Sequence, residues 1–326
     1  MTGRPLTRIA HTRFFAGAIA LAATVCACIY FFTGHTVPLT ADYGLGLPSA
    51  NLWFSVPVIS LAAAFAAGIG TIVAMTLLNK IYNVLRSMTM LFAAFFAAMQ
   101  IATPDIATQF FTGSLLAVVV PACLLLLFSC YKSSDASRRV FLIFFVLSAL
   151  TATQYCYAIY LIASFAGLGQ MRIFNLRNLL ASLMGIVTPW ILLLGFGIVS
   201  PSEIDMPELA SIFAALNLED AVLLVATVSF TAAVTLLLYI INVVRTIAYN
   251  ARARAFNGSF TLVLLLTLAA MCADYQNIIA YLPLFNFSCA MEMAHFFSTH
   301  RGDKTFIAIF GIIAVYFALF LCQIVI

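Results

Sequence analysis

Residues 138–177, RRVFLIFFVLSALTATQYCYAIYLIASFAGLGQMRIFNLR, decide how many times this chain crosses a membrane. A long apolar stretch lies here between arginines at both ends. Lys and Arg in short loops stay on the cytoplasmic side of a membrane, so a single crossing would place one arginine pair on the wrong side. We therefore predict a short helical hairpin over residues 140–170, with a break near residues 151–154. Arms of about 14 residues span only about 21 Å, so the hairpin either crosses fully or is re-entrant and buried among other helices.

The rest of the sequence has the composition of a membrane protein. Only 8% of its 326 residues are charged and 64% are hydrophobic, whereas about 25% of the residues of a soluble domain are charged. Apolar stretches of the length that a bilayer requires cover residues 14–32, 52–78, 87–103, 109–130, 178–200, 221–244, 256–273, 277–298 and 305–326. We predict an all-α polytopic transmembrane helical bundle of about 11 spans, with residues 1–326 forming a single integral membrane domain.

The charges predict the orientation of this bundle. All fifteen Lys and Arg residues fall in alternate loops, and the loops between them carry acids such as Asp42, Asp105 and Asp274 but no base. The positive-inside rule then places the N-terminus in the cytoplasm and the C-terminus outside. The first apolar stretch ends in bulky residues, so we expect a retained signal anchor. The net charge of +4 follows from topology, and no nucleic-acid partner is expected.

Eight cysteines lie inside apolar stretches, where we expect them to act as small packing residues. Cys26 and Cys28 are two positions apart and point in different directions on a helix, without a third ligand nearby. No metal site is predicted, and the cofactors, if the protein uses any, stay unknown.

Ionisable side chains inside a span are costly and are the first places to look for function. Glu292 lies inside the stretch 277–298, and His295 follows it on the same helical face, so the two side chains can share a proton or a hydrogen bond. One interpretation is an intramembrane polar pair that relays a proton or contacts a substrate. The other is structural, with Glu292 snorkelling or pairing with an arginine such as Arg172 or Arg301.

Other polar and small residues carry weaker signals. Tyr155, Tyr157 and Tyr160 lie at the expected hairpin tip, where their hydroxyls can satisfy backbone groups at helix ends, line an aromatic site, or form an interfacial belt. Gly185 precedes a Pro189 kink, and we expect close helix packing there. Residues 206–218 predict an amphipathic helix lying flat in the outer interface.

Asp42 is the acidic residue of the first outer loop. Membrane glycosyltransferases that use lipid-linked sugars place a carboxylate in this loop as a general base or metal ligand, so Asp42 is a candidate catalytic residue. The alternative is a solvated loop residue. The outer loops offer no Lys or Arg to hold a diphosphate, which argues against the enzyme.

Four short motifs indicate a resemblance to a known protein family. They are RIFNLR at 172–177, GIVTP at 185–189, LPL at 282–284 and AHFF at 294–297. Taken together, the chain resembles an uncharacterised polytopic inner-membrane protein family of Bacteroidota with no established activity. The resemblance implies a multi-pass protein of the bacterial inner (cytoplasmic) membrane in a cell-envelope setting, and it transfers no catalytic residue.

Three functions are compatible with the sequence. The first is a glycosyltransferase-like or polymerase-like enzyme, or an accessory protein, that handles polyprenyl-linked sugars with Asp42 as base. The second is a proton-coupled transporter or flippase that uses Glu292 and His295. The third is a non-catalytic subunit that binds other envelope membrane proteins. In each case the lipid bilayer is a partner, and whether the protein is an enzyme stays open.

Overall fold

The computed structural model describes residues 9–34, 45–200, 204, 218–247, 249–300 and 305–325. Within these ranges the chain is all helical, with twelve α-helices and no strand. The α-helices are α2 (Arg13–Phe32), α3 (Pro57–Tyr82), α4 (Leu91–Ile101), α5 (Pro104–Thr108), α6 (Thr112–Ser129), α7 (Ser137–Thr151), α8 (Ala158–Gln170), α9 (Leu176–Gly195), α11 (Leu218–Ile247), α12 (Ala251–Ala273), α13 (Ile278–Thr299) and α14 (Thr305–Val325). Short 3-10 turns occupy Ala50–Leu52, Tyr155–Tyr157 and Tyr275–Asn277.

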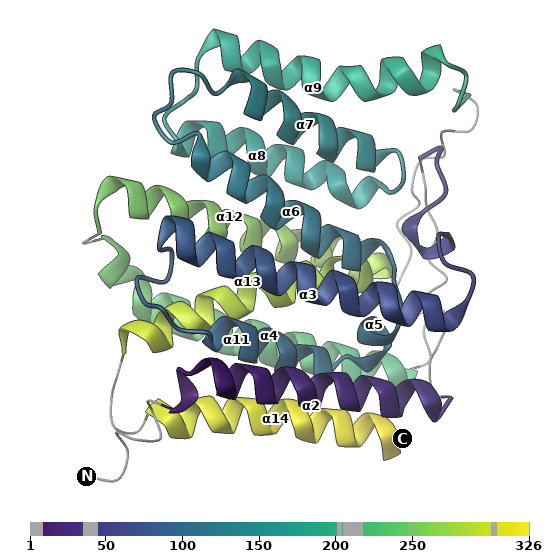
Figure 1. Ribbon diagram of the computed structural model, residues 1–326, viewed down its shortest axis with the longest axis vertical. Coiled ribbons are helices and arrows are strands. Elements are labelled where there is room, and N and C mark those ends of the chain that lie inside the picture. Colours follow the sequence, from purple (N-terminus) through teal and green to yellow (C-terminus); the bar gives the residue numbers. More distant parts are fainter. Residues whose placement is uncertain are drawn as a thin grey trace.

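The long helices lie side by side in a row, with α9 at one end of the long axis and α2 and α14 at the other (Figure 1). The helix ends form two layers, and hydrogen bonds join the ends of different helices within the same layer. In one layer the Tyr30 hydroxyl donates to Asp105 at 3.0 Å and the Gln323 amide donates to the Ala102 carbonyl at 3.0 Å. In the other layer the Ser298 hydroxyl donates to the Leu85 carbonyl at 3.0 Å. The bundle is therefore one helix length thick, as a membrane slab requires.

Seven helices, α2, α3, α6, α9, α11, α12 and α14, are long and apolar enough to cross a bilayer. Outer helices expose large apolar side chains, among them Met184 and Ile191 of α9 and Leu321 of α14, which is the pattern of a lipid-facing surface. The chain is thus a multi-pass membrane protein. α13 is also 22 residues long, but Asn286, Glu292 and His295 make it less apolar than the seven.

α13 is the central helix of the bundle. Almost every side chain from Ile278 to Ser298 is buried, and α13 packs against α4, α6, α11 and α12. A polar residue placed on α13 therefore lies in the protein interior and not in lipid. This position sets the environment of Glu292 and His295.

The hairpin predicted over residues 140–170 is present. α7 ends at Thr151, α8 begins at Ala158, and the two pack against each other. α9 packs along α7 at Gly185, where an added Cβ would lie 2.7 Å from the Phe141 carbonyl oxygen and 2.8 Å from the Phe144 Cβ. The close packing expected at Gly185 is thus confirmed.

Several helices differ in their bounds from the expected spans, and in two of them a proline explains the difference. The stretch 87–103 forms only the 11-residue α4, about 16 Å long, because Pro104 starts a separate short helix, α5. The stretch 52–78 begins its helix later, at Pro57, since proline is well suited to the first turn of a helix but not to its interior. The expected interfacial helix at residues 206–218 lies outside the described residues.

The basic residues with described side chains share one layer of helix ends. Arg13, Arg139 and Arg177 lie in the first turns of α2, α7 and α9, and Lys80 lies in the last turn of α3. These termini all lie on the side of the N-terminus (Figure 1). The alternation of charge along the sequence therefore places these basic residues on one side of the folded protein.

Candidate functional site

Glu292 and His295 lie in the interior near the basic ends of three helices. Both side chains are buried, and both line a cavity of about 160 Å³ between α11, α12 and α13. The two other helices contribute Tyr239 from α11, and Arg254 and Asn257 from α12. α11 and α12 each pack along α13 but touch each other at few points, so the cavity lies in the gap between them. The two residues singled out from the sequence therefore share a site.

His295 is held from both sides of its ring. Its Nδ1 lies 3.3 Å from the Asn242 amide nitrogen and its Nε2 lies 3.2 Å from the Tyr249 hydroxyl. Because an amide nitrogen only donates, Nδ1 accepts, and Nε2 carries the proton and donates to Tyr249. Arg86 lies over the Tyr249 ring with its Cζ 4.2 Å from the centroid. The His295 ring is therefore held in a fixed orientation.

Glu292 has a different environment. Its side chain is 8% exposed, yet its carboxyl makes no hydrogen bond and no ion pair with any described residue. The hydrogen bond expected between Glu292 and His295 is absent from this part of the chain, because Asn242 and Tyr249 occupy both ring nitrogens. An ion pair with Arg172 is also absent, and Arg301 lies outside the described residues. The carboxyl of Glu292 therefore faces the cavity without a partner from the part of the chain that the structure describes.

A second unpartnered group lies beside the same cavity. Asn257 of α12 is 8% exposed, and its amide nitrogen finds no hydrogen-bond partner among the described residues. Arg254, one turn closer to the start of α12, is exposed to the surface. The cavity thus leads from the surface at Arg254 to the Glu292 carboxyl, which has no partner among the described residues, and passes beside the buried amide of Asn257. Such groups are costly unless a ligand, proton or water satisfies them.

The opposite end of α13 carries a carboxylate that is fully satisfied. Asp274 is 6% exposed and accepts hydrogen bonds from the Tyr155 hydroxyl at 2.6 Å, the Tyr281 hydroxyl at 3.0 Å and the Asn277 amide at 3.1 Å. Tyr155 belongs to the tip of the α7–α8 hairpin, so this cluster ties the hairpin to the α12–α13 turn. The sequence indicates only that Asp274 is an acid of an outer loop.

The other two tyrosines of the hairpin, Tyr157 and Tyr160, also form hydrogen bonds inside the bundle. The Tyr157 hydroxyl donates to the Thr112 carbonyl at 3.2 Å, and Tyr160 pairs with Thr267 at 3.1 Å. Both side chains are buried, so they form neither an exposed aromatic belt nor a binding surface.

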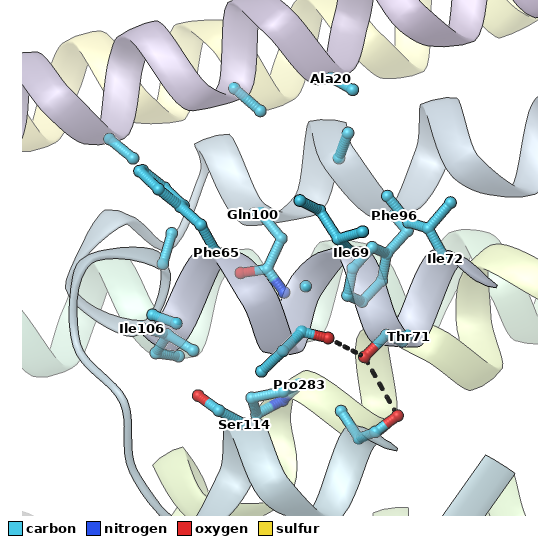
Figure 2. A pocket seen from close by; sticks show the side chains of 18 of the residues that line it. Ala20, Phe65, Ile69, Thr71, Ile72, Phe96, Gln100, Ile106, Ser114 and Pro283 are labelled. Carbon is cyan, nitrogen blue, oxygen red and sulfur yellow. Dashed lines mark hydrogen bonds between the residues drawn. The ribbon is translucent and has the colours of Figure 1, made fainter. Parts of the chain in front are cut away.

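A larger, apolar cavity of about 260 Å³ lies between α2, α3 and α4, with α6 behind it. Small residues such as Ala20 and Gly68 line it together with Phe65 and Ile69, and the Gln100 amide lies among them (Figure 2). It is separate from the cavity of Glu292 and shares no lining residue with it. Its lining suits a hydrocarbon chain and not a polar solute.

Asp42, the candidate catalytic residue, lies outside the described residues and stays a prediction. Asn242, Asn257 and Arg254 were missed, although asparagines within apolar helices are a signal of the same kind as Glu292. All eight cysteines are free, and Cys123, Cys130, Cys156 and Cys289 are buried. Comparison with known protein families, with curated proteins and with solved structures found no match.

Proposed function

We propose that this multi-pass membrane protein is a proton-coupled transporter for a small polar solute, with Glu292 as the residue that carries the coupling proton. The observation that carries the proposal is the carboxyl of Glu292, which is buried, faces a cavity and has no partner among the described residues. An isolated carboxylate is costly in such a place, whereas the neutral, protonated form is not. Proton binding and release at Glu292 therefore change the charge inside the cavity, and with it the free energy of binding a polar solute there. Coupling of solute transport to a proton gradient requires such a change.

We also propose a topology for the chain. The chain crosses the bacterial inner membrane eleven times, counting α4, α7, α8 and α13 with the seven long spans, and its N-terminus and basic layer face the cytoplasm. The grouping of basic residues in one layer supports this orientation. The cavity at Glu292 then opens toward the cytoplasm, and the Asp274 cluster closes the opposite side.

Uptake from a mixture of solutes tests the function without a known substrate. Purified protein in liposomes is incubated with a polar metabolite extract under a pH gradient in either direction, and the trapped solutes are measured by mass spectrometry. We expect at least one solute to accumulate in wild-type vesicles in a gradient-dependent manner. Glu292→Gln removes the gradient dependence while the protein still inserts and elutes as a single species.

The matched control is Arg252→Gln, because Arg252 lies on the same turn of α12 as Arg254 but contacts the rings of Phe256 and Tyr131 and not the cavity. This variant transports as wild type does. Identical trapped solutes in wild-type, Glu292→Gln and protein-free vesicles under both gradients would refute the proposal.

A second candidate function is the handling of polyprenyl-linked sugars, which the apolar cavity of Figure 2 favours. Adding a side chain at Gly68, which has no atom within 4 Å of an added Cβ, fills this cavity. Under this function Gly68→Leu and Asp42→Asn both stop glycan assembly, and Gly68→Leu also reduces the lipid that co-purifies with the protein. Normal assembly in both variants would exclude it.

A further inference from the structure

The apolar cavity of Figure 2 opens sideways between two membrane-spanning helices. Its walls are α2 and α3, which each pack against α4 and α5 but hardly touch each other. Ile69 lines the cavity from α3 and is 63% exposed. Ala20 and Ala27 line it from α2, roughly 18 and 8 Å from the end of that helix at Phe32. The opening therefore lies at the depth of the hydrocarbon layer, and a ligand enters it from lipid and not from water.

Two polar side chains inside this cavity lack partners. Ser114, in the first turn of α6, is 7% exposed, and Gln100 lies in the last turn of α4. Both line the cavity (Figure 2), and neither the Ser114 hydroxyl nor the side-chain amide of Gln100 makes a hydrogen bond with any described residue. Unlike the amide nitrogen of Asn257, neither group is shut off from its cavity. A hydrocarbon chain fills the space but leaves both groups unsatisfied, which is costly at this depth.

From these observations we propose that the cavity binds the head of a neutral lipid alcohol. The lipid enters between α2 and α3, its hydroxyl pairs with the Gln100 amide and the Ser114 hydroxyl, and its hydrocarbon chain extends into the bilayer. The volume of about 260 Å³ exceeds the roughly 150 Å³ of an apolar cavity that holds benzene, so it takes the head group and the start of the chain. This inference goes beyond the proposed transport, because the two cavities share no lining residue.

The chemistry of the lining selects this class of lipid. None of the described residues that line the cavity is charged, so a phosphate or ammonium head is too costly to bury there. The Gln100 amide both donates and accepts hydrogen bonds, and so does the Ser114 hydroxyl. A ketone or ester carbonyl only accepts, and it leaves the Gln100 carbonyl oxygen unpaired. A hydroxyl donates as well as accepts, and it therefore satisfies more of these groups than a carbonyl does.

Competition photolabelling of the full-length protein in nanodiscs tests the inference. The probe is a lipid alcohol with a photoreactive diazirine in its chain, and mass spectrometry identifies the labelled peptides. The competitors are dodecanol, dodecane, dodecyl phosphate and a methyl ketone of the same chain length. We expect label on the peptides of α2 and α3. We also expect dodecanol to compete at least tenfold better than dodecane and dodecyl phosphate, and several-fold better than the ketone.

Variants separate the hydrogen bonds from the space. Gln100→Leu and Ser114→Ala each reduce the preference for dodecanol over dodecane by about fivefold, the effect of one lost hydrogen bond, and leave competition by dodecane itself unchanged. A residue with a merely structural role would change both competitors alike. Gly68 has no atom within 4 Å of an added Cβ, so Gly68→Leu fills the cavity and removes the label.

Two matched controls come from α2. The Thr24 hydroxyl lines the same cavity but already donates to the Ala20 carbonyl at 3.0 Å, so Thr24→Val keeps the preference for dodecanol. Gly17 also has free space around an added Cβ but does not line the cavity, so Gly17→Leu keeps the label that Gly68→Leu removes.

Three results would overturn the inference. Equal competition by dodecanol and dodecane would mean that the cavity takes only a hydrocarbon chain. Competition by the ketone equal to or better than that of dodecanol would assign the cavity to a lipid carbonyl. Wild-type protein without label on the peptides of α2 and α3 would show that no lipid alcohol enters between them.

Discussion

Glu292 and Asp274 are buried carboxyls near opposite ends of α13, and we expect replacement by an apolar side chain to change protein stability in opposite directions at the two positions. Glu292→Met and Asp274→Leu each replace a carboxyl by an apolar side chain of similar size. Glu292 has no partner among the described residues, whereas Asp274 accepts three hydrogen bonds. We expect the change at Glu292 to stabilise the protein and the change at Asp274 to destabilise it.

The magnitudes follow from these contacts. Burial of a polar group without a hydrogen bond costs about 1–3 kcal/mol in protein mutational data, so Glu292→Met raises the free energy of unfolding by about that amount. Hydrogen bonds between membrane helices contribute about 0.6 kcal/mol each, so losing the three bonds to Asp274 costs about 2 kcal/mol. A change of 1 kcal/mol shifts the Tm of a protein of this size by roughly 2 °C.

Thermal unfolding in detergent, followed by intrinsic fluorescence, measures both shifts on the same scale. We expect Glu292→Met to raise Tm by roughly 2 to 6 °C and Asp274→Leu to lower it by roughly 4 °C. Glu292→Met also abolishes gradient-dependent uptake, so stability and function move in opposite directions at this position. A fall in Tm for Glu292→Met comparable to that of Asp274→Leu would show that Glu292 is a paired structural carboxyl and would refute the reasoning.

Three further predictions concern packing and topology. Gly185→Ala places a methyl group against the backbone of α7 and lowers Tm by several degrees, whereas Gly195→Ala, where nothing lies within 4 Å, does not lower it; an equal fall for both would show that the contact with α7 is not the cause. In a cysteine-free background, a cysteine at Asp135 reacts with an impermeant reagent only from the cytoplasm and one at Phe196 only from outside, and the reverse pattern would invert the topology. Arg177→Ala removes an exposed ion pair of 3.7 Å to Asp135 and changes stability by less than about 0.5 kcal/mol; a larger loss in denaturant titrations would contradict this.

The sequence predicted the candidate site only in part. It drew attention to Glu292 and His295 because ionisable residues are rare in spans. It also suggested that they share a hydrogen bond, which was wrong: helical spacing places the two residues on one face but does not say which third residue competes. Asn242 and Tyr249, contributed by α11 and the turn after it, occupy the His295 ring.

The Asp274 cluster had no signal in the local sequence. Its carboxylate is bound by Tyr155, a residue 119 positions away. A loop acid in solvent and a buried, hydrogen-bonded acid have the same neighbours in sequence. Only the packing of the α7–α8 hairpin against the α12–α13 turn distinguishes them.

The sequence by itself determined that the chain resides in a membrane, that its basic residues share one side, and that residues 140–170 form a hairpin. Whether a segment spans a bilayer, and in which direction, depends on its own length, apolarity and flanking charge, which are local properties of the sequence. Only the tertiary structure decided that α13 is the central helix, that Asp274 is satisfied and that Glu292 is not. Partners for a buried charge come from other helices, and hydropathy does not encode which helices become neighbours.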